Sequence, residues 1–453
     1  LSLFSTLQGY RKEYLLKDIF SGIIIAAVSI PISMGYAQIS GIPAVYGLYG
    51  SVLPILLFAL FSTSRQFIFG VDAAPAAIVG GALSTLGIAA ESEAAMDYVP
   101  AIALFAGLWL FVFFLLHADK IVDFISTPVM GGFISGIAVT IILMQIPKLM
   151  GSPAGSGELL ELAEHIFAAA KNISWLSLCM GLGALILIRI FKKLAPKFPM
   201  AIAIMALGVL STVVFHVDEK GVVLLQSVER GLPSLVIPDF GNVDLTQAAG
   251  RGLMVAVVIM AETLLAENTF AFRNDYKLND RQEILSCAAG NIAAAAVGCC
   301  PVNGSISRTS LNEQYGGKSQ AVSITAGITM ALILLFGTGF IGYLPVPVLT
   351  AIVISALMDV VETHLAVRLF KVSRTEFYIF MAAGFSVLCL GTIYGVIIGI
   401  LLSFVAVILK ATNPPRSFRG MIPGRDVYFD LSRNRYAYPI KGVVIYRFSE
   451  NLF

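Results

Sequence analysis

Apolar runs of helical length follow one another along almost the whole chain, and they constrain its fold more than any other feature. About fourteen lie between residues 19 and 411, several shorter than the roughly 20 residues that span a bilayer. Hydrophobic residues make up 57% of the 453 residues and charged residues 13%, against about 25% charged in a soluble domain. Because a water-soluble protein could not bury this much apolar surface, we predict an α-helical membrane protein in a lipid bilayer.

The distribution of Lys and Arg predicts how these segments are oriented. Basic residues such as Arg65, Lys120 and Arg273 follow even-numbered segments, whereas the loop 91–97 after the third segment is acidic. Positive charge favours the cytoplasmic side, so we expect both termini in the cytoplasm and a chain that crosses the inner (plasma) membrane many times. The predicted segments are 19–38, 43–62, 73–89, 99–117, 123–147, 173–191, 198–216, 249–271, 281–298, 304–316, 320–340, 345–361, 375–392 and 393–411.

The segments divide into two sets of seven, 19–216 and 249–411, joined by an extracytoplasmic loop at 217–248. Seven is odd, so the second set enters the membrane in the opposite orientation, which predicts an inverted repeat. The two most interrupted segments, 73–89 and 304–316, are third in their sets. They begin at matching distances, 54 residues from 19 to Ala73 and 56 residues from 249 to Ser305.

The two ends of the chain differ from the apolar body. Residues 1–18 are amphipathic and basic without a cleavage site, which predicts a cytoplasmic segment rather than a signal peptide. In the stretch 412–453, a polar linker at 411–420 precedes two predicted strands at 427–431 and 442–448. Two strands do not fold alone, so this stretch is expected to be the truncated start of a cytoplasmic α/β domain.

The interrupted pair predicts an anion site. Non-helical backbone at membrane depth is tolerated where it is buried in protein or lines a cavity. Two half-helices that start near the midplane would direct free N–H groups and a partial positive charge at one point. Gly304 allows close approach, Ser305 and Ser307 add hydroxyls, and Arg308 adds a full charge. The alternative is that Arg308 lies nearer the interface and extends to it, while the glycines allow helix packing.

Four stretches of the sequence carry a family resemblance. They are IPISMGYAQISGIPAVYGLYGS (30–51), TSRQFIFGVDAA (63–74), GNIAAAAVGCCPVNGSISRTSLN (290–312) and GGKSQ (316–320). With them the chain resembles the SulP family of anion transporters, the sulfate permeases, whose animal relatives include prestin. The resemblance implies seven plus seven helices in a core and a gate domain, half-helices 3 and 10 meeting at the midplane, elevator-like movement and a homodimer. The C-terminal stretch resembles the beginning of the family's STAS domain.

The resemblance also implies the site residues. The substrate-binding positions are Tyr36, Asp72, Ala73, Ala74, Gly304, Ser305, Ile306, Ser307 and Arg308, and the ion-coupling position is Glu262. One departure is Ile32, where the family usually carries a glutamine. Another is Asp72, an acid where an anion would be held. Asp72 is either the N-cap of the third helix, bonded to its N2 or N3 amide, or a partner of Arg308 or of a coupling ion.

Glu262 is expected to couple transport to protons. A carboxyl group in an apolar cavity favours its neutral form, and a neutral Glu262 would stop repelling a neighbouring anion. Sodium is less favoured, because Ala266 replaces a hydroxyl of some sodium-dependent relatives and leaves few oxygen ligands besides Thr263. The structural alternative is a salt bridge between Glu262 and Arg308.

We therefore predict a secondary active transporter of a small anion, a sulfate-like oxyanion or a small carboxylate, with no cofactor, no metal and no nucleic-acid partner. No nucleophile–base set or metal-ligand spacing suggests an enzyme, and the five cysteines show no such spacing. Three alternatives stay open: sodium-dependent bicarbonate uptake, a nucleobase-type transporter of the same fold, and a non-transporting membrane anchor or motor. Asp359 and Glu362 are interpreted as a solvated face or a contact for the STAS domain.

Overall fold

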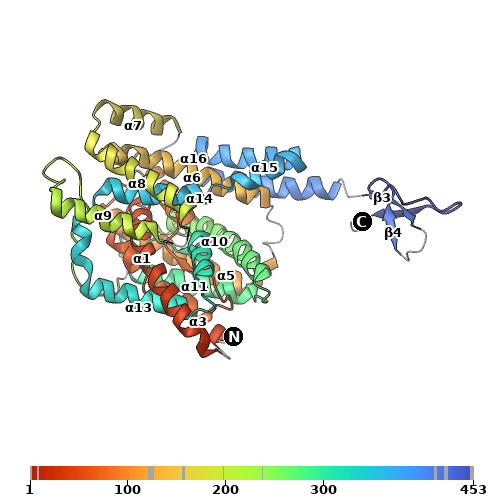
Figure 1. Ribbon diagram of the computed structural model, residues 1–453, viewed down its shortest axis with the longest axis horizontal. Helices are drawn as coiled ribbons and strands as arrows, with labels where there is room; N and C mark the ends of the chain where they lie inside the picture. Colours follow the sequence, from red (N-terminus) through yellow and green to blue (C-terminus); the bar gives the residue numbers. More distant parts are fainter. Residues whose placement is uncertain are drawn as a thin grey trace.

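The computed structural model describes residues 3–7, 10–120, 127–155, 159–196, 198–236, 238–412, 416–422 and 427–448. Helices build the body of the molecule (Figure 1). The first part contains η1 (Ser5–Leu7), η2 (Lys12–Tyr14), α1 (Leu15–Ile39), α2 (Val45–Tyr49), α3 (Leu53–Phe61), α4 (Ala73–Thr85), α5 (Glu93–Leu115), α6 (Thr127–Leu149), α7 (Leu159–Lys171), α8 (Trp175–Leu194) and α9 (Met200–Phe215). The second contains α10 (Leu245–Arg273), α11 (Asp280–Ala296), α12 (Ile306–Tyr315), α13 (Ala321–Phe336), η4 (Thr338–Tyr343), α14 (Val346–Val360), α15 (Thr363–Val372) and α16 (Arg374–Thr412).

The described helices carry the marks of a multi-pass membrane protein. By length and composition, six of them could cross a bilayer: Lys12–Ile39, Glu93–Leu115, Thr127–Leu149, Trp175–Leu194, Leu245–Arg273 and Val346–Val372. Outer helices leave large apolar side chains uncovered, among them Ile186 and Ile190 on α8 and Leu207 and Leu210 on α9. In water these faces would be unfavourable, whereas lipid tails solvate them.

One predicted segment forms two helices, and two other predicted segments form one kinked helix. The segment 43–62 forms two helices, α2 and α3, and Pro54 lies in the first turn of α3, where its missing N–H leaves no hydrogen bond unmade. The predicted boundary between 375–392 and 393–411 falls at Gly391 inside α16. Gly391 has φ 84° and ψ 167°, a conformation that side-chain-bearing residues avoid, and it kinks the helix there.

The helices pack in two groups around the centre of the chain. Helix α5 packs against α10 and α11, and α3 packs against α11 and α13. On the other side, α6 packs against α14 and α16, and α8 packs against α14. Figure 1 shows α6, α8, α14 and α16 running together along one side of the body. Helix α1 contacts both groups through α13 and α14.

A small antiparallel sheet follows α16, and its first strand occupies part of the stretch 411–420 that was predicted to be a linker. Its strands are β3 (Arg416–Met421), β4 (Tyr428–Asp430) and β5 (Ile445–Phe448), with β3 between the other two. The strands β4 and β5 lie within the predicted strands, but residues 416–420 of the predicted linker belong to the central strand. Their polar, proline-flanked composition concealed a strand whose hydrogen bonds come from both neighbours.

Candidate functional site

The non-helical stretches before α4 and α12 meet as a two-stranded ladder. β1 (Phe69–Gly70) pairs antiparallel with β2 (Asn303–Gly304), with Phe69 opposite Gly304 and Gly70 opposite Asn303. The amide of Ser305 also donates to the carbonyl of Ile68 at 2.8 Å. These bonds satisfy the backbone polar groups that a non-helical stretch would otherwise leave unpaired in the protein interior. The ladder brings the beginnings of α4 and α12 together.

Glycines make this close approach possible. A Cβ atom on Gly304 would lie 1.9 Å from Cε1 of Phe67, whose ring is fully buried. A Cβ atom on Gly70 would lie 2.9 Å from Nη1 of Arg308. The expected role of Gly304 in close backbone approach is therefore visible as a specific contact with an aromatic ring.

Arg308 is buried behind the ladder, with 1% of its surface exposed. Its Nη2 donates to the carbonyl of Val71 at 2.6 Å and its Nη1 to Oγ of Ser29 at 3.5 Å, while Nε has no partner in the described part of the chain. This burial contradicts the alternative that Arg308 extends to the interface. The described residues also contain no ion pair between Arg308 and Glu262 or Asp72. The arginine fixes the backbone just before α4.

Asp72 caps α4. It has extended backbone angles of φ −140° and ψ 170°, and its Oδ1 accepts a hydrogen bond from the amide of Ala73 at 2.8 Å. The N-cap interpretation is confirmed, although the amide belongs to the first residue of the helix rather than to N2 or N3. Asp72 also lies close enough to Arg308 for their charges to interact.

Glu262 on α10 is tied to β2 through an asparagine. Its Oε2 accepts a hydrogen bond from Nδ2 of Asn303 at 2.6 Å, and Oδ1 of Asn303 accepts one from Oγ1 of Thr263 at 2.6 Å. The same Thr263 oxygen accepts from the amide of Gly304 at 3.3 Å. Glu262 is 7% exposed and Asn303 is fully buried. This network takes the place of the salt bridge from Glu262 to Arg308 that was the structural alternative, and the sequence did not single out Asn303.

A cavity of about 390 Å³ lies beside these helix starts. Six of the predicted site residues line it: Asp72, Ala73, Ala74, Glu262, Ile306 and Ser307. The other four, Tyr36, Gly304, Ser305 and Arg308, are buried behind them and do not line it in the described part of the chain. Ile32, at the position where a glutamine was expected, adds an apolar wall. The cavity thus receives the first turns of both half-helices.

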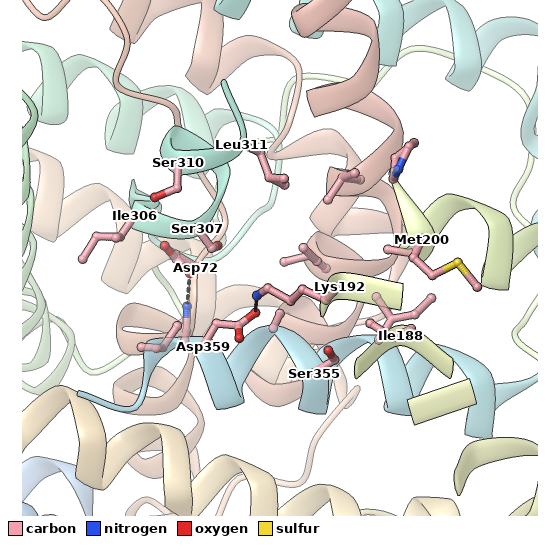
Figure 2. A pocket seen from close by; sticks show the side chains of 18 of the residues that line it. Asp72, Ile188, Lys192, Met200, Ile306, Ser307, Ser310, Leu311, Ser355 and Asp359 are labelled. Carbon is pink, nitrogen blue, oxygen red and sulfur yellow. Dashed lines mark hydrogen bonds and ion pairs between the residues drawn. The ribbon is translucent and has the colours of Figure 1, made fainter. Parts of the chain in front are cut away.

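The opposite wall of the cavity carries a pair of opposite charges that the sequence did not predict. Lys192 on α8 and Asp359 on α14 both line the cavity and form an ion pair, as Figure 2 shows. Arg189 pairs with the same carboxylate at 2.8 Å. Asp359 is exposed, as the interpretation of a solvated face expects, but its carboxylate also lines the cavity and pairs with two cations. The spacing of Arg189 and Lys192, three apart on one helical face, is the signal in the sequence from which a shared partner could have been predicted.

Comparison with known proteins identifies the family. The model of the sulfate permease family matches residues 15–383. The chain belongs to the sulfate permease family. Members similar to it include a probable sulfate transporter of Mycobacterium tuberculosis, 26% identical over 445 residues that cover 98% of this chain and 79% of that protein. Another is the chloroplastic sulfate transporter 4.1 of Arabidopsis thaliana, 30% identical over 461 residues that cover 99% of this chain and 67% of that protein.

Solved structures show that this sulfate permease family member has the transmembrane fold of the SLC26 proteins. Murine SLC26A9, an anion transporter solved in the inward-facing state, matches with a TM-score of 0.82 and 19% identity, covering 98% of this chain and 76% of that chain. The transmembrane domain of the cyanobacterial bicarbonate transporter BicA matches with a TM-score of 0.76 and 19% identity, covering 87% and 98%. The resemblance to a helical membrane transport family is confirmed at the level of family and fold.

Proposed function

We propose that this protein is a secondary active transporter of a small anion, a sulfate-like oxyanion or a small carboxylate. The observation that carries the proposal is the cavity in which two helices begin. Ala73 and Ala74 of α4 and Ile306 and Ser307 of α12 line the same space. The amide of Ala73 is taken by the Asp72 cap and Pro75 has no N–H, so Ala74 and the first turn of α12 supply the free amides. With the partial positive charge of each helix end, these amides favour an anion there. The relatives named as sulfate transporters support the same substrate class.

Protons are the coupling ion in this proposal. Four carboxylates line the cavity, Asp72, Glu262, Asp359 and Glu362, and Lys192 is the one cation among the described lining residues. Arg189 and Lys192 compensate Asp359, but Glu262 has only a neutral amide beside it. An anion beside an ionised Glu262 would meet repulsion in a poorly solvated space. A proton taken up at Glu262 together with the anion removes that repulsion, which links the two movements.

Several broader features belong to the same proposal. The two sets of helices form an inverted repeat with both termini in the cytoplasm, and one group of helices moves against the other in an elevator-like way. The protein acts as a homodimer, and the sheet β3–β5 is the beginning of a STAS domain. The pairing of two helix starts by β1 and β2 and the packing of the helices in two groups support the inverted repeat and the relative movement of the groups. The homodimer and the STAS domain rest on the family resemblance, and the orientation of the termini rests on the distribution of Lys and Arg.

The experiment is sulfate uptake into proteoliposomes with an imposed pH gradient. Wild-type protein should accumulate sulfate when the outside is acidic, and Glu262→Gln should keep sulfate exchange but lose its dependence on the gradient. Exchange without any effect of Glu262→Gln on the gradient dependence contradicts the coupling role. Uptake of bicarbonate that requires sodium would favour the bicarbonate alternative, which the likeness to BicA supports. The absence of flux with every anion tested would favour a non-transporting anchor.

A further inference from the structure

The wall of the cavity formed by α8 and α14 carries a built arrangement of charges. Lys192 lines the cavity, and its Nζ pairs with Oδ2 of Asp359. Arg189 pairs through Nη1 with Oδ1 of the same carboxylate at 2.8 Å but is not a lining residue. Figure 2 shows Lys192 and Asp359 facing the side of the cavity from which Ser307 and Ser310 of α12 project. Two cations therefore share one carboxylate, and only one of them faces the space for the substrate.

This arrangement leaves Lys192 free to exchange its partner. The Lys192 side chain is 51% exposed, and ion pairs of that exposure contribute little net free energy. If Lys192 leaves Asp359, Arg189 still neutralises the carboxylate, so no buried charge is left without a partner. A lysine ammonium also has three donors on a flexible stem, which allows it to follow an anion without a fixed bidentate geometry.

The charges that line the cavity determine which group an entering anion can pair with. Of the four lining carboxylates, Asp72 precedes α4, Glu262 lies on α10, Asp359 lies on α14 and Glu362 follows α14, so none lies on α8. The positive charge of Arg308 lies behind the ladder and outside the lining in the described part of the chain. Lys192 is thus the one full positive charge that a substrate in this cavity meets directly among the described lining residues.

We propose that Lys192 is an anion-binding residue, and that an entering anion replaces Asp359 as the partner of its ammonium group. The inference rests on the proposed transport of small anions and adds a contact on the wall opposite the half-helices. Asp359 acts as an internal competitor: it holds Lys192 when the cavity contains no anion and remains paired with Arg189 when the cavity is filled. The ligand class is an oxyanion or carboxylate small enough for the cavity.

The test compares the concentration dependence of sulfate uptake in proteoliposomes for variants on the two sides of the pair. Lys192→Gln should raise the KM for sulfate about tenfold or more, the loss expected when a charged hydrogen bond is removed. Asp359→Asn should lower the KM, because the competitor is gone. Lys192→Arg should stay within about threefold of wild type, since the charge remains. Lys193→Gln, a substitution of the neighbouring exposed lysine on α8, is the control for general surface charge.

The directions of these shifts decide the inference. If the pair only stabilises the fold, Lys192→Gln and Asp359→Asn break the same contact and should change the KM in the same direction, which overturns the proposal. An unchanged KM in Lys192→Gln, or an equal rise in Lys193→Gln, also overturns it. If Lys192→Gln does not fold, the Asp359→Asn variant decides alone, and a raised KM for sulfate in that variant overturns the proposal. Wild-type protein that shows neither anion flux nor an anion-dependent melting temperature overturns the proposed function itself, and this inference with it.

Discussion

Replacement of Asn303 by alanine tests the link between the helix that carries Glu262 and the ladder that positions both half-helices. Asn303 donates to Oε2 of Glu262 and accepts from Oγ1 of Thr263, each at 2.6 Å, and it is fully buried. No other hydrogen-bond donor reaches the Glu262 carboxylate within the described residues. In Asn303→Ala, water has little access to replace either bond.

The expected loss can be worked from these two contacts. A hydrogen bond to a charged group is worth about 1.5–3 kcal/mol and a neutral one about 1 kcal/mol. The sum gives a loss of about 2.5–4 kcal/mol in the free energy of unfolding. The cavity left by the deleted amide group adds to this loss. Asn303 is part of β2, which leads directly into α12. Because loss of its bonds would loosen the start of that helix, where the anion is proposed to bind, we also expect weaker sulfate binding.

Thermal unfolding of the purified protein in detergent measures the first effect, and the rise in melting temperature caused by sulfate measures the second. Asn268→Ala is a matched control. Asn268 also donates to a carboxylate, Asp280, at 3.1 Å and to the carbonyl of Leu264 at 3.0 Å, but it is exposed, so water replaces both bonds. We expect the control to lose less than about 1 kcal/mol. If Asn303→Ala melts like Asn268→Ala, the Asn303 bridge does not stabilise the site.

Three other substitutions test neighbouring parts of the site. Gly304→Ala should destabilise the protein by about 1–3 kcal/mol in thermal unfolding, since the new Cβ atom would lie 1.9 Å from the Phe67 ring; a neutral result would show that the ring has room to move. Glu283→Gln should lower the free energy of unfolding by about 2–4 kcal/mol in the same assay. The Glu283 carboxylate accepts four hydrogen bonds from residues 62–64, and the NH2 group of a glutamine would face N–H and O–H groups that also donate. Arg308→Lys should reduce the sulfate-dependent rise in melting temperature, because an ammonium group cannot reproduce the guanidinium contacts to Val71 and Ser29; full retention would show that only the charge matters.

The half-helices were predictable from the sequence because their signals are local. A proline, glycines and hydroxyl residues interrupt an apolar run, and the same interruption occurs at a matching distance in the other half of the chain. The structure places β1 and β2 within these stretches and starts α4 and α12 at Ala73 and Ile306, close to the predicted starts. The N-cap at Asp72 was predictable for the same reason, since a cap depends on residues next to each other.

The partners of the charged and polar side chains at the site were not predictable, because they depend on packing between distant parts of the chain. Arg308 finds the carbonyl of Val71, 237 residues away, instead of a carboxylate. Lys192 and Asp359 are 167 residues apart and meet because α8 packs against α14. The role of Asn303 depends on the register of the β1–β2 ladder and on its contact with α10. Composition shows that such charges must be compensated, but it cannot identify the compensating group.

In the proposed function, the groups that attract an anion into the cavity differ from the groups that control how long it stays bound. Arg308 cannot touch a substrate that lies in the cavity, because its guanidinium is bonded to the backbone behind α4. In the proposed function, its charge would act through the field at the helix starts, while backbone amides and Ser307, which lines the cavity, would make the direct contacts on that side. A site built in this way has no deeply bound counter-charge of its own to trap the anion. Release then depends on groups that can change their charge or partner, and the lining residues Glu262 and Lys192 are placed to do so, by taking up a proton and by returning to Asp359.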